Sequence, residues 1–165
     1  MQHATRKIFL HPGELVFAES GTHVHTILGS CVAICLWHPL LKFGGMCHFL
    51  LPSRPAGTAA SGEFDGRYGD EAMQLFDQVV RLHHTGCDEY QAEIFGGANA
   101  IGSSTESTEN LIGKRNIEKA KQLLSVRQIE IKTVQVCESQ HQRIVMDFST
   151  GHVRVVIPSQ KLQPT

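Results

Sequence analysis

Residues 26–52 read TILGSCVAICLWHPLLKFGGMCHFLLP, and the fold of the chain is decided in this stretch. Residues 32–37 and residues 46–51 are apolar and partly β-branched, which is typical of buried strands. The segment between them, residues 38–45, is too long for a two-residue turn and predicts a loop. We therefore expect an antiparallel hairpin at the centre of the fold.

A flexible corner precedes the first of these strands. Gly29 and Ser30 interrupt the strand-like residues, so Cys31 follows a position where backbone N–H groups can point at a ligand. Antiparallel pairing returns the far end of the second strand to this corner, which brings His48 toward Cys31. The sequence thus predicts a cysteine–histidine pair beside a corner that suits an oxyanion.

This pair permits two interpretations. Because the thiolate is the nucleophile, an imidazolium that lowers the thiol pKa and protonates a leaving group would support covalent catalysis. Buried free cysteine is, however, among the commonest small core residues, and a cysteine with a sequence-distant histidine is only a candidate nucleophile. Spacing alone leaves both interpretations of Cys31 open.

Further motifs accompany the pair in a fixed order. They are GSCVAICLWHP at 29–39, GGMCHFLLP at 44–52, GRYGDEAM at 66–73, EIFGGAN at 93–99 and IGKRNIEKA at 112–120. In this order they resemble the CheD family of chemoreceptor glutamine deamidases, and the resemblance covers nearly the whole chain. A set of ordered motifs is far more specific than any one of them.

The resemblance implies catalytic roles for individual residues. Cys31 corresponds to the family's nucleophile and His48 to its base. A threonine shortly before the GSC motif also belongs to the family's site. Thr26 is the nearest match, and His25 stands beside it as the alternative.

Two backbone segments are expected to contact the substrate. Amides near Gly29 and Ser30 would stabilise the oxyanion formed at a substrate amide. The glycines of the GGAN segment permit a close backbone approach, and in a CheD-like site its amides or Asn99 would bind the substrate amide. The alternative for GGAN is an ordinary strand-to-loop turn.

The whole chain predicts mixed α/β structure with about nine strand segments and two helices. Hairpins dominate, which excludes a doubly wound parallel sheet. The resemblance further implies a three-layer α/β/β sandwich with mixed, mostly antiparallel sheets, the cysteine hydrolase fold of certain deamidating toxins. We expect helices at 70–82, capped by Asp70 and with Leu82 in its apolar stripe, and at 113–125. The expected strands are 14–18, 22–28, 32–37, 46–51, 89–95, 130–137, 143–149 and 152–157, and the last two should form a hairpin about Thr150 and Gly151.

The first two expected strands precede the cysteine corner. Residues 14–18 and 22–28 predict a hairpin around a Ser-Gly turn, whereas residues 1–13 show no period. Alternation puts Thr26 on one face of the second strand and His25 on the other. His25 is most simply a solvent-side residue.

The length and the net charge of the chain limit the classes of function that it can have. A chain of 165 residues fits one domain, residues 1–165, that buries a continuous core. Fifteen Lys and Arg against sixteen Asp and Glu give a net charge of −1, and no basic block argues for nucleic acid. No run of transmembrane length and no secretory segment is present, so we expect a cytoplasmic protein without membrane insertion.

The cysteines predict reduced thiols, because their count of five is odd and their spacing irregular. Cys35 and Cys47, together with the adjacent His48, are residue types that could bind zinc. Neighbouring strand residues face opposite ways, however, and neither a CxxC nor an HxxxH pair occurs. We expect no metal site, and the chemistry requires no organic cofactor.

Three further segments lie outside the motifs. Residues 52–64 are rich in Pro, Gly, Ala and Ser and predict a surface loop that flanks the cleft or merely links two elements. Residues 101–110 predict a polar loop. Residues 137–143, CESQHQR, depart from relatives that carry a Gly-rich turn followed by Arg.

The expected activity is hydrolysis of a glutamine side-chain amide through a thioester. The resemblance implies methyl-accepting chemotaxis receptors as substrates, methyl-ester hydrolysis as a side activity and a CheC-type phosphatase as a partner. A non-catalytic chemotaxis binding module that docks on receptors or on such a phosphatase stays open. A different cysteine hydrolase, either a peptidase or a transamidase, is the third class.

Overall fold

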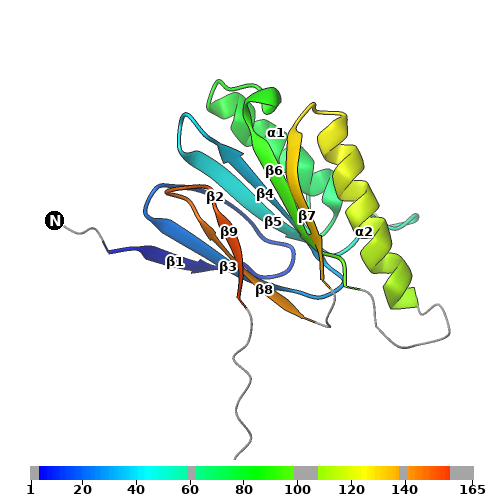
Figure 1. Cartoon of the computed structure of the whole chain (residues 1–165). Coiled ribbons are helices and arrows are strands. Elements are labelled where there is room, and N and C mark those ends of the chain that lie inside the picture. Colours follow the sequence, from blue (N-terminus) through cyan, green and yellow to red (C-terminus); the bar gives the residue numbers. More distant parts are fainter. Residues whose placement is uncertain (1–3, 59–61, 99–107, 138–140, 157–165) are drawn as a thin grey trace, which may run out of the picture.

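The structure, a computed structural model, describes residues 4–58, 62–98, 108–137 and 141–156 (Figure 1). These residues form a sheet-dominated mixed α/β fold, the class that the sequence predicts. The strands are β1 (Arg6–Phe9), β2 (Leu15–Glu19), β3 (Thr22–Leu28), β4 (Val32–His38), β5 (Phe43–Phe49), β6 (Gln91–Gly96), β7 (Glu130–Val136), β8 (Gln142–Asp147) and β9 (Val153–Val156). The α-helices are α1 (Gly69–Leu82) and α2 (Thr108–Ser125), and a short 3-10 helix spans Cys87–Glu89.

The described strands divide between two sheets. One has the order β1-β3-β8-β9 and the other the order β2-β5-β4-β6-β7. Neighbouring strands are antiparallel except for β1 with β3 and β6 with β7, which confirms the predicted mixed, mostly antiparallel pairing. Helix α2 connects β6 to β7, since parallel neighbours need a crossover.

The predicted central hairpin forms from β4 and β5, but its loop is shorter than expected. The ladder continues to Phe43, so residues 39–42 form the connection and not residues 38–45. The glycines lie within β5 because a side chain has no room there: a Cβ on Gly44 would lie 2.0 Å from the Leu36 carbonyl oxygen. They mark a close backbone approach and not a turn.

The predicted hairpin of residues 14–18 and 22–28 is wrong. Both strands form, but β2 pairs with β5 in one sheet, whereas β3 pairs with β1 and β8 in the other. The chain therefore crosses between the sheets at its Ser-Gly turn. Strand β1 lies in the segment where the sequence shows no period, and it is held as a short parallel partner of β3. The alternation of apolar and polar residues identifies a strand, but it does not identify the strand with which that strand pairs.

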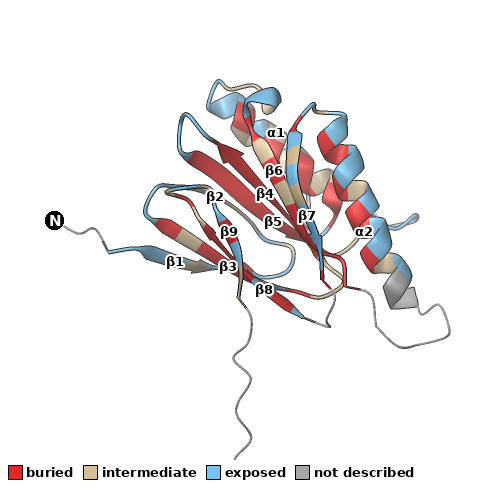
Figure 2. Cartoon of the chain, viewed as in Figure 1, coloured by how far each residue is buried: buried red, intermediate tan, exposed pale blue. Residues whose placement is uncertain are grey.

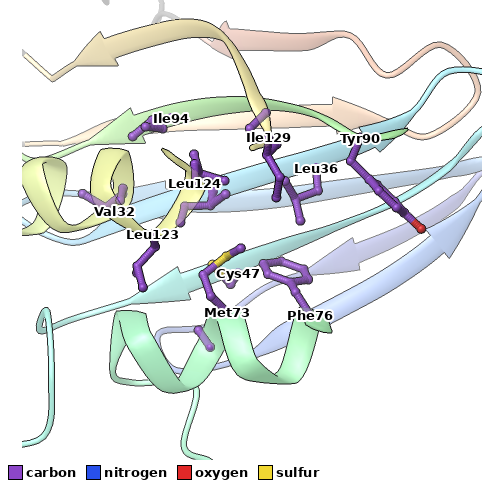
Figure 3. Packing of buried hydrophobic residues seen from close by; sticks show 14 of the residues in the cluster. Val32, Leu36, Cys47, Met73, Phe76, Tyr90, Ile94, Leu123, Leu124 and Ile129 are labelled. Carbon is purple, nitrogen blue, oxygen red and sulfur yellow. The ribbon is translucent and has the colours of Figure 1, made fainter. Parts of the chain in front are cut away.

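Strand β4 has buried side chains on both faces, and Figure 2 shows β4 and β5 buried along their length. Val32, Ile34 and Leu36 belong to the core that includes α1 and α2. Ala33, Cys35 and Trp37 belong to the core shared with β3 and β8 of the other sheet. Figure 3 shows the helix-facing core, in which Met73 and Phe76 of α1 point toward Cys47 of β5.

The two helices match the predicted ranges in part. Helix α1 begins after Tyr68, which has no side-chain cap, so the predicted Asp70 cap is wrong. Leu82 is 75% exposed and lies outside the apolar stripe, because the buried face shifts toward Met73 and Val80. Helix α2 begins at Thr108, inside the predicted polar loop. Its predicted stripe is buried: Ile117, Ala120, Leu123 and Leu124.

An ion pair joins the two helices at the end of α2. Arg127 donates two hydrogen bonds to the carboxylate of Asp77 in α1, both at 2.8 Å, and a third to the Leu123 carbonyl. Within the described residues, no helix is long and apolar enough to cross a membrane.

Candidate active site

Cys31 occupies the turn between β3 and β4, where its side chain is half-buried. Three carbonyl groups of this turn have hydrogen-bond donors. The Ala98 N–H donates to the Gly29 oxygen at 2.7 Å, and the Gly97 N–H donates to the Cys31 oxygen at 2.9 Å. The Asn116 side chain donates to the Ser30 oxygen at 3.1 Å. Hydrogen bonds from two other segments thus hold the turn.

His48 lies near the end of β5 and is 1% exposed. The ladder pairs it with Ala33, so the position of Cys31 is its diagonal neighbour one step beyond the ladder. Side chains at diagonal positions on one face of a sheet lie within reach of one another. The observed register therefore gives His48 and Cys31 the diagonal relation on which the predicted pair depends.

The hydroxyl of Thr26 connects His48 to the other sheet. Thr26 Oγ1 lies 2.8 Å from His48 Nδ1 and also 2.8 Å from the Leu10 carbonyl oxygen. A hydroxyl has one proton, and the carbonyl can only accept, so Thr26 donates to Leu10 and accepts from Nδ1–H. His48 therefore carries its proton on Nδ1, and the Nε2 lone pair remains as the basic atom of the neutral ring.

Burial governs the protonation of both groups. Desolvation lowers the pKa of His48 to about 4, so the imidazole is neutral at pH 7. Burial raises the pKa of the Cys31 thiol, and the thiol's own backbone N–H offsets part of that rise. These directions differ from the expected imidazolium that lowers the thiol pKa, because desolvation disfavours both charged forms. In the free protein the pair is a neutral thiol and a neutral base.

Residues 96–98 of the GGAN segment lie against the Cys31 turn, but the amides of Gly97 and Ala98 already donate hydrogen bonds. Gly97 and Ala98 donate hydrogen bonds to the carbonyl groups of the turn and so hold its backbone in place. The φ angle of Gly96 is +109°, and a Cβ there would lie 2.2 Å from the Cys31 carbonyl oxygen. Asn99, the predicted amide-binding side chain, lies outside the described residues.

His25 does not join this group. It lies on the opposite face of β3 from Thr26, and its ring stacks on Phe9 with the centroids 5.3 Å apart. It is 7% exposed and not the solvent-side residue that alternation predicted, because Phe9 covers it. Among the described residues neither ring nitrogen has a hydrogen-bond partner. Burial, followed by the Arg143 charge, lowers the pKa of His25.

The structure separates the cysteines that invited a zinc site. Cys47 packs in the helix-facing core, whereas Cys35 packs between the sheets. Among the described residues, no three or more His, Cys, Asp or Glu side chains gather where they could hold a metal. None of the five cysteines, all of which lie in the described part of the chain, forms a disulfide bond.

Asn116 is the residue that the sequence analysis missed. It is fully buried in α2, and besides Ser30 it donates to the Leu50 carbonyl oxygen at 2.8 Å. The signal was present in the sequence, since this polar residue stands three positions after Gly113 and one before Ile117, inside the apolar stripe. A buried amide on such a stripe requires partners.

Comparisons with known proteins agree with the motifs. The family model described as CheD chemotactic sensory transduction matches residues 50–156. "Probable chemoreceptor glutamine deamidase CheD 3" of Dechloromonas aromatica is 41% identical over 152 residues, 92% of this chain and 88% of that protein. "Probable chemoreceptor glutamine deamidase CheD" of Pseudomonas syringae pv. tomato is 36% identical over 150 residues, 90% of this chain and 88% of that protein.

One further relative and one solved structure complete the comparison. "Probable chemoreceptor glutamine deamidase CheD 2" of Albidiferax ferrireducens is 40% identical over 148 residues, 88% of this chain and 84% of that protein. The hypothetical protein YfiH of Bacillus licheniformis covers 83% of this chain and 61% of its own, with 13% identity and a TM-score of 0.42. A likeness at that level supports no argument.

Proposed function

The chain belongs to the CheD family of chemotactic sensory transduction proteins, and from this premise we propose that it deamidates glutamine side chains of chemotaxis receptors. The reaction converts glutamine to glutamate and releases ammonia. The names of the relatives support the substrate class. The observation that carries the proposal for the site is the hydrogen bond between Thr26 and His48, which leaves Nε2 of a neutral imidazole as a base beside the Cys31 turn.

The first step is attack by Cys31. His48 Nε2 takes the thiol proton while the sulfur forms a bond to the carboxamide carbon of the substrate glutamine. General-base activation fits a site in which burial keeps both groups neutral at rest. The carbonyl electron pair moves onto oxygen, and backbone N–H groups of the Gly29–Ser30–Cys31 turn stabilise this oxyanion.

The second step is the loss of ammonia. The His48 imidazolium returns its proton to the amide nitrogen, the carbon–nitrogen bond breaks, and a thioester on Cys31 remains. A pKa of about 4 makes this imidazolium a strong acid, which favours protonation of the leaving group. Thr26 accepts the Nδ1–H bond throughout, so the ring keeps its orientation as its charge changes.

Hydrolysis completes the cycle. Neutral His48 takes a proton from water, the resulting hydroxide attacks the thioester carbon, and Cys31 leaves as the thiolate, which the imidazolium reprotonates. The receptor keeps the new glutamate. The same steps apply to a methyl ester, with methanol as the leaving group, and this is the proposed side activity.

The proposal extends to the fold and the cellular setting. The helices on one face of the five-stranded sheet and the second sheet on its other face support the three-layer α/β/β sandwich of deamidating toxins. We assign the whole chain, residues 1–165, to one deamidase domain that acts in the cytoplasm, where receptor signalling domains lie. No step requires a metal or organic cofactor. A CheC-type phosphatase is the proposed regulatory partner.

The test measures ammonia released from a purified receptor cytoplasmic domain. Wild type and Cys87→Ala should release ammonia, whereas Cys31→Ala should not. Cys87 is the matched control because it is also a half-buried free thiol. Receptor binding without ammonia from any of the three proteins would favour the non-catalytic binding module, and peptide cleavage or cross-linking would favour a different cysteine hydrolase.

A further inference from the structure

The side chain of Asn116 bridges the two halves of the candidate site. Its amide nitrogen donates to the Ser30 carbonyl oxygen at 3.1 Å and to the Leu50 carbonyl oxygen at 2.8 Å. Ser30 immediately precedes the proposed nucleophile, and Leu50 follows the proposed base by two residues. A single fully buried side chain thus uses both of its N–H donors on the two segments that must stay in register.

This bridge is possible because α2 lies close to Gly97 and Ala98. Gly113 lies one turn before Asn116, and a Cβ on Gly113 would lie 2.8 Å from the carbonyl oxygens of both Gly97 and Ala98. The helix can contact the GGAN segment only because this position lacks a side chain. Residues three apart share a face of a helix, so the approach at Gly113 carries Asn116 to the Cys31 turn.

The bond to Ser30 fixes the direction of the next amide. The C=O and N–H of one trans peptide unit point in opposite directions. Because the Ser30 carbonyl points at α2, the Cys31 N–H points away from α2. This N–H belongs to the same residue as the sulfur, so the two groups lie close together, and the N–H lowers the pKa of the Cys31 thiol. An amide in that place meets the oxygen of a carbonyl group that the sulfur attacks.

Neighbouring bonds reinforce the same arrangement. The Gly29 oxygen accepts from Ala98 N–H and the Cys31 oxygen accepts from Gly97 N–H, so the carbonyl groups on both sides of Ser30 are also held by hydrogen bonds. The Ser30 carbonyl is the one member of this set that a side chain holds, and it belongs to the peptide unit that supplies the N–H at the sulfur.

We propose that Asn116 is a positioning residue for acyl transfer, which aims the Cys31 backbone N–H at the developing oxyanion by holding the Ser30 carbonyl against α2. This role rests on the proposed deamidase function. Asn116 touches neither substrate nor reacting atoms. Through Leu50 it also ties the nucleophile turn to the strand that carries His48.

The test separates oxyanion stabilisation from simple folding. Asn116→Ala is compared with wild type and with Leu124→Ala, a control that opens a cavity in the buried face of α2 but removes only an apolar side chain and no hydrogen-bond donor. Deamidation forms an oxyanion, whereas alkylation of a thiolate by iodoacetamide does not. Asn116→Ala should therefore lose about 10²-fold in kcat for receptor deamidation at unchanged KM. Its limiting alkylation rate at high pH should stay within about twofold of wild type.

A second readout does not depend on turnover. Because the N–H at the sulfur stabilises the thiolate, its displacement should move the pH midpoint of Cys31 alkylation upward in Asn116→Ala and not in Leu124→Ala. If Asn116→Ala does not fold, Asn116→Ser replaces it, since one hydroxyl cannot serve both carbonyl groups at these distances.

Each outcome decides the proposal. A kcat equal to that of Leu124→Ala, or a limiting alkylation rate that falls in parallel with kcat, would overturn the positioning role. Absence of ammonia release by wild type would count against the deamidase function instead. In that case the alkylation midpoint alone decides: an upward shift confined to the Asn116 variant supports the role, and equal midpoints in all proteins overturn it.

Discussion

At the scale of single residues, the site depends on one hydroxyl that sits between two sheets. Thr26 comes from β3 and His48 from β5, so their hydrogen bond joins the two sheets across the core that lies between them. The Leu10 carbonyl determines the direction of this bond and with it the tautomer of His48. Burial then keeps the ring neutral at pH 7. The proposed chemistry at Cys31 thus depends on hydrogen bonds of a hydroxyl and on burial.

The buried imidazole predicts a pH dependence of stability. Its pKa is about 4 in the folded state and 6.5 as an ordinary histidine, so below pH 6.5 the unfolded state binds more protons. The free energy of unfolding should therefore fall as pH decreases from 6.5 to 4, by about 3 kcal/mol for this group. Urea titrations at several pH values measure it as the difference between wild type and His48→Gln. A difference that does not change with pH would show that His48 is not desolvated.

Removal of the Thr26 hydroxyl should impair the base and not the binding of substrate. Thr26→Val keeps the shape but leaves the Leu10 carbonyl and His48 Nδ1–H without partners, which should lower the free energy of unfolding by about 1 to 3 kcal/mol. We expect kcat for ammonia release to fall by about 10²-fold at unchanged KM. Thr26→Ser, which restores the hydroxyl, should recover most of kcat. Equal activity of the two variants would argue against the assigned tautomer.

At the scale of elements, the sequence predicted which segments are strands and helices better than how they pair. The β4–β5 hairpin and the β8–β9 hairpin were predictable because each strand and its partner are adjacent in the chain. The β2–β3 hairpin was wrong because hydrogen-bond partners come from distant segments. The approach of His48 to Cys31 could be predicted because one hairpin relates the two positions. Asn116 was missed because its partners lie 86 and 66 residues away.

Substitution of Gly96, at the end of β6, tests how closely the GGAN segment packs against the Cys31 turn. Gly96→Ala would place a Cβ 2.2 Å from the Cys31 carbonyl oxygen, whereas Gly21→Ala meets nothing within 4 Å. The φ angles are +109° and +91°, so both substitutions share the backbone strain. The clash should cost Gly96→Ala about 1 to 3 kcal/mol more in the free energy of unfolding, measured by chemical denaturation. Ammonia release should fall only in Gly96→Ala, and equal behaviour of both variants would contradict the close packing.

At the scale of the whole molecule, β4 and β5 couple two cores. Side chains of β4 alternate between the core with the helices and the core between the sheets, so neither core can loosen without moving the same strands. The proposed catalytic residues lie at the shared end of these strands: Cys31 precedes β4, and His48 is the penultimate residue of β5. The position of the site thus depends on both cores at once.

This coupling predicts one cooperative unfolding transition. Trp37, the single tryptophan, packs between the sheets and reports on that core by fluorescence, whereas far-UV circular dichroism reports largely on α1 and α2. The two probes should give the same guanidinium midpoint. Ile34→Ala on the helix side and Met46→Ala on the sheet side should each lower both midpoints together, with losses of about 2 to 5 kcal/mol. Separate transitions would show that the cores unfold independently.

The most direct test of thiol-dependent deamidation follows the oxygen atom that enters the receptor. A receptor cytoplasmic domain is incubated in heavy-oxygen water with wild type, Cys31→Ala or Cys87→Ala, and its peptides are analysed by mass spectrometry. With wild type and Cys87→Ala, specific glutamines should become glutamates that each contain one heavy oxygen, because water hydrolyses the thioester. With Cys31→Ala they should remain glutamine. Conversion by Cys31→Ala at the wild-type rate, or none by folded wild type, would contradict the account.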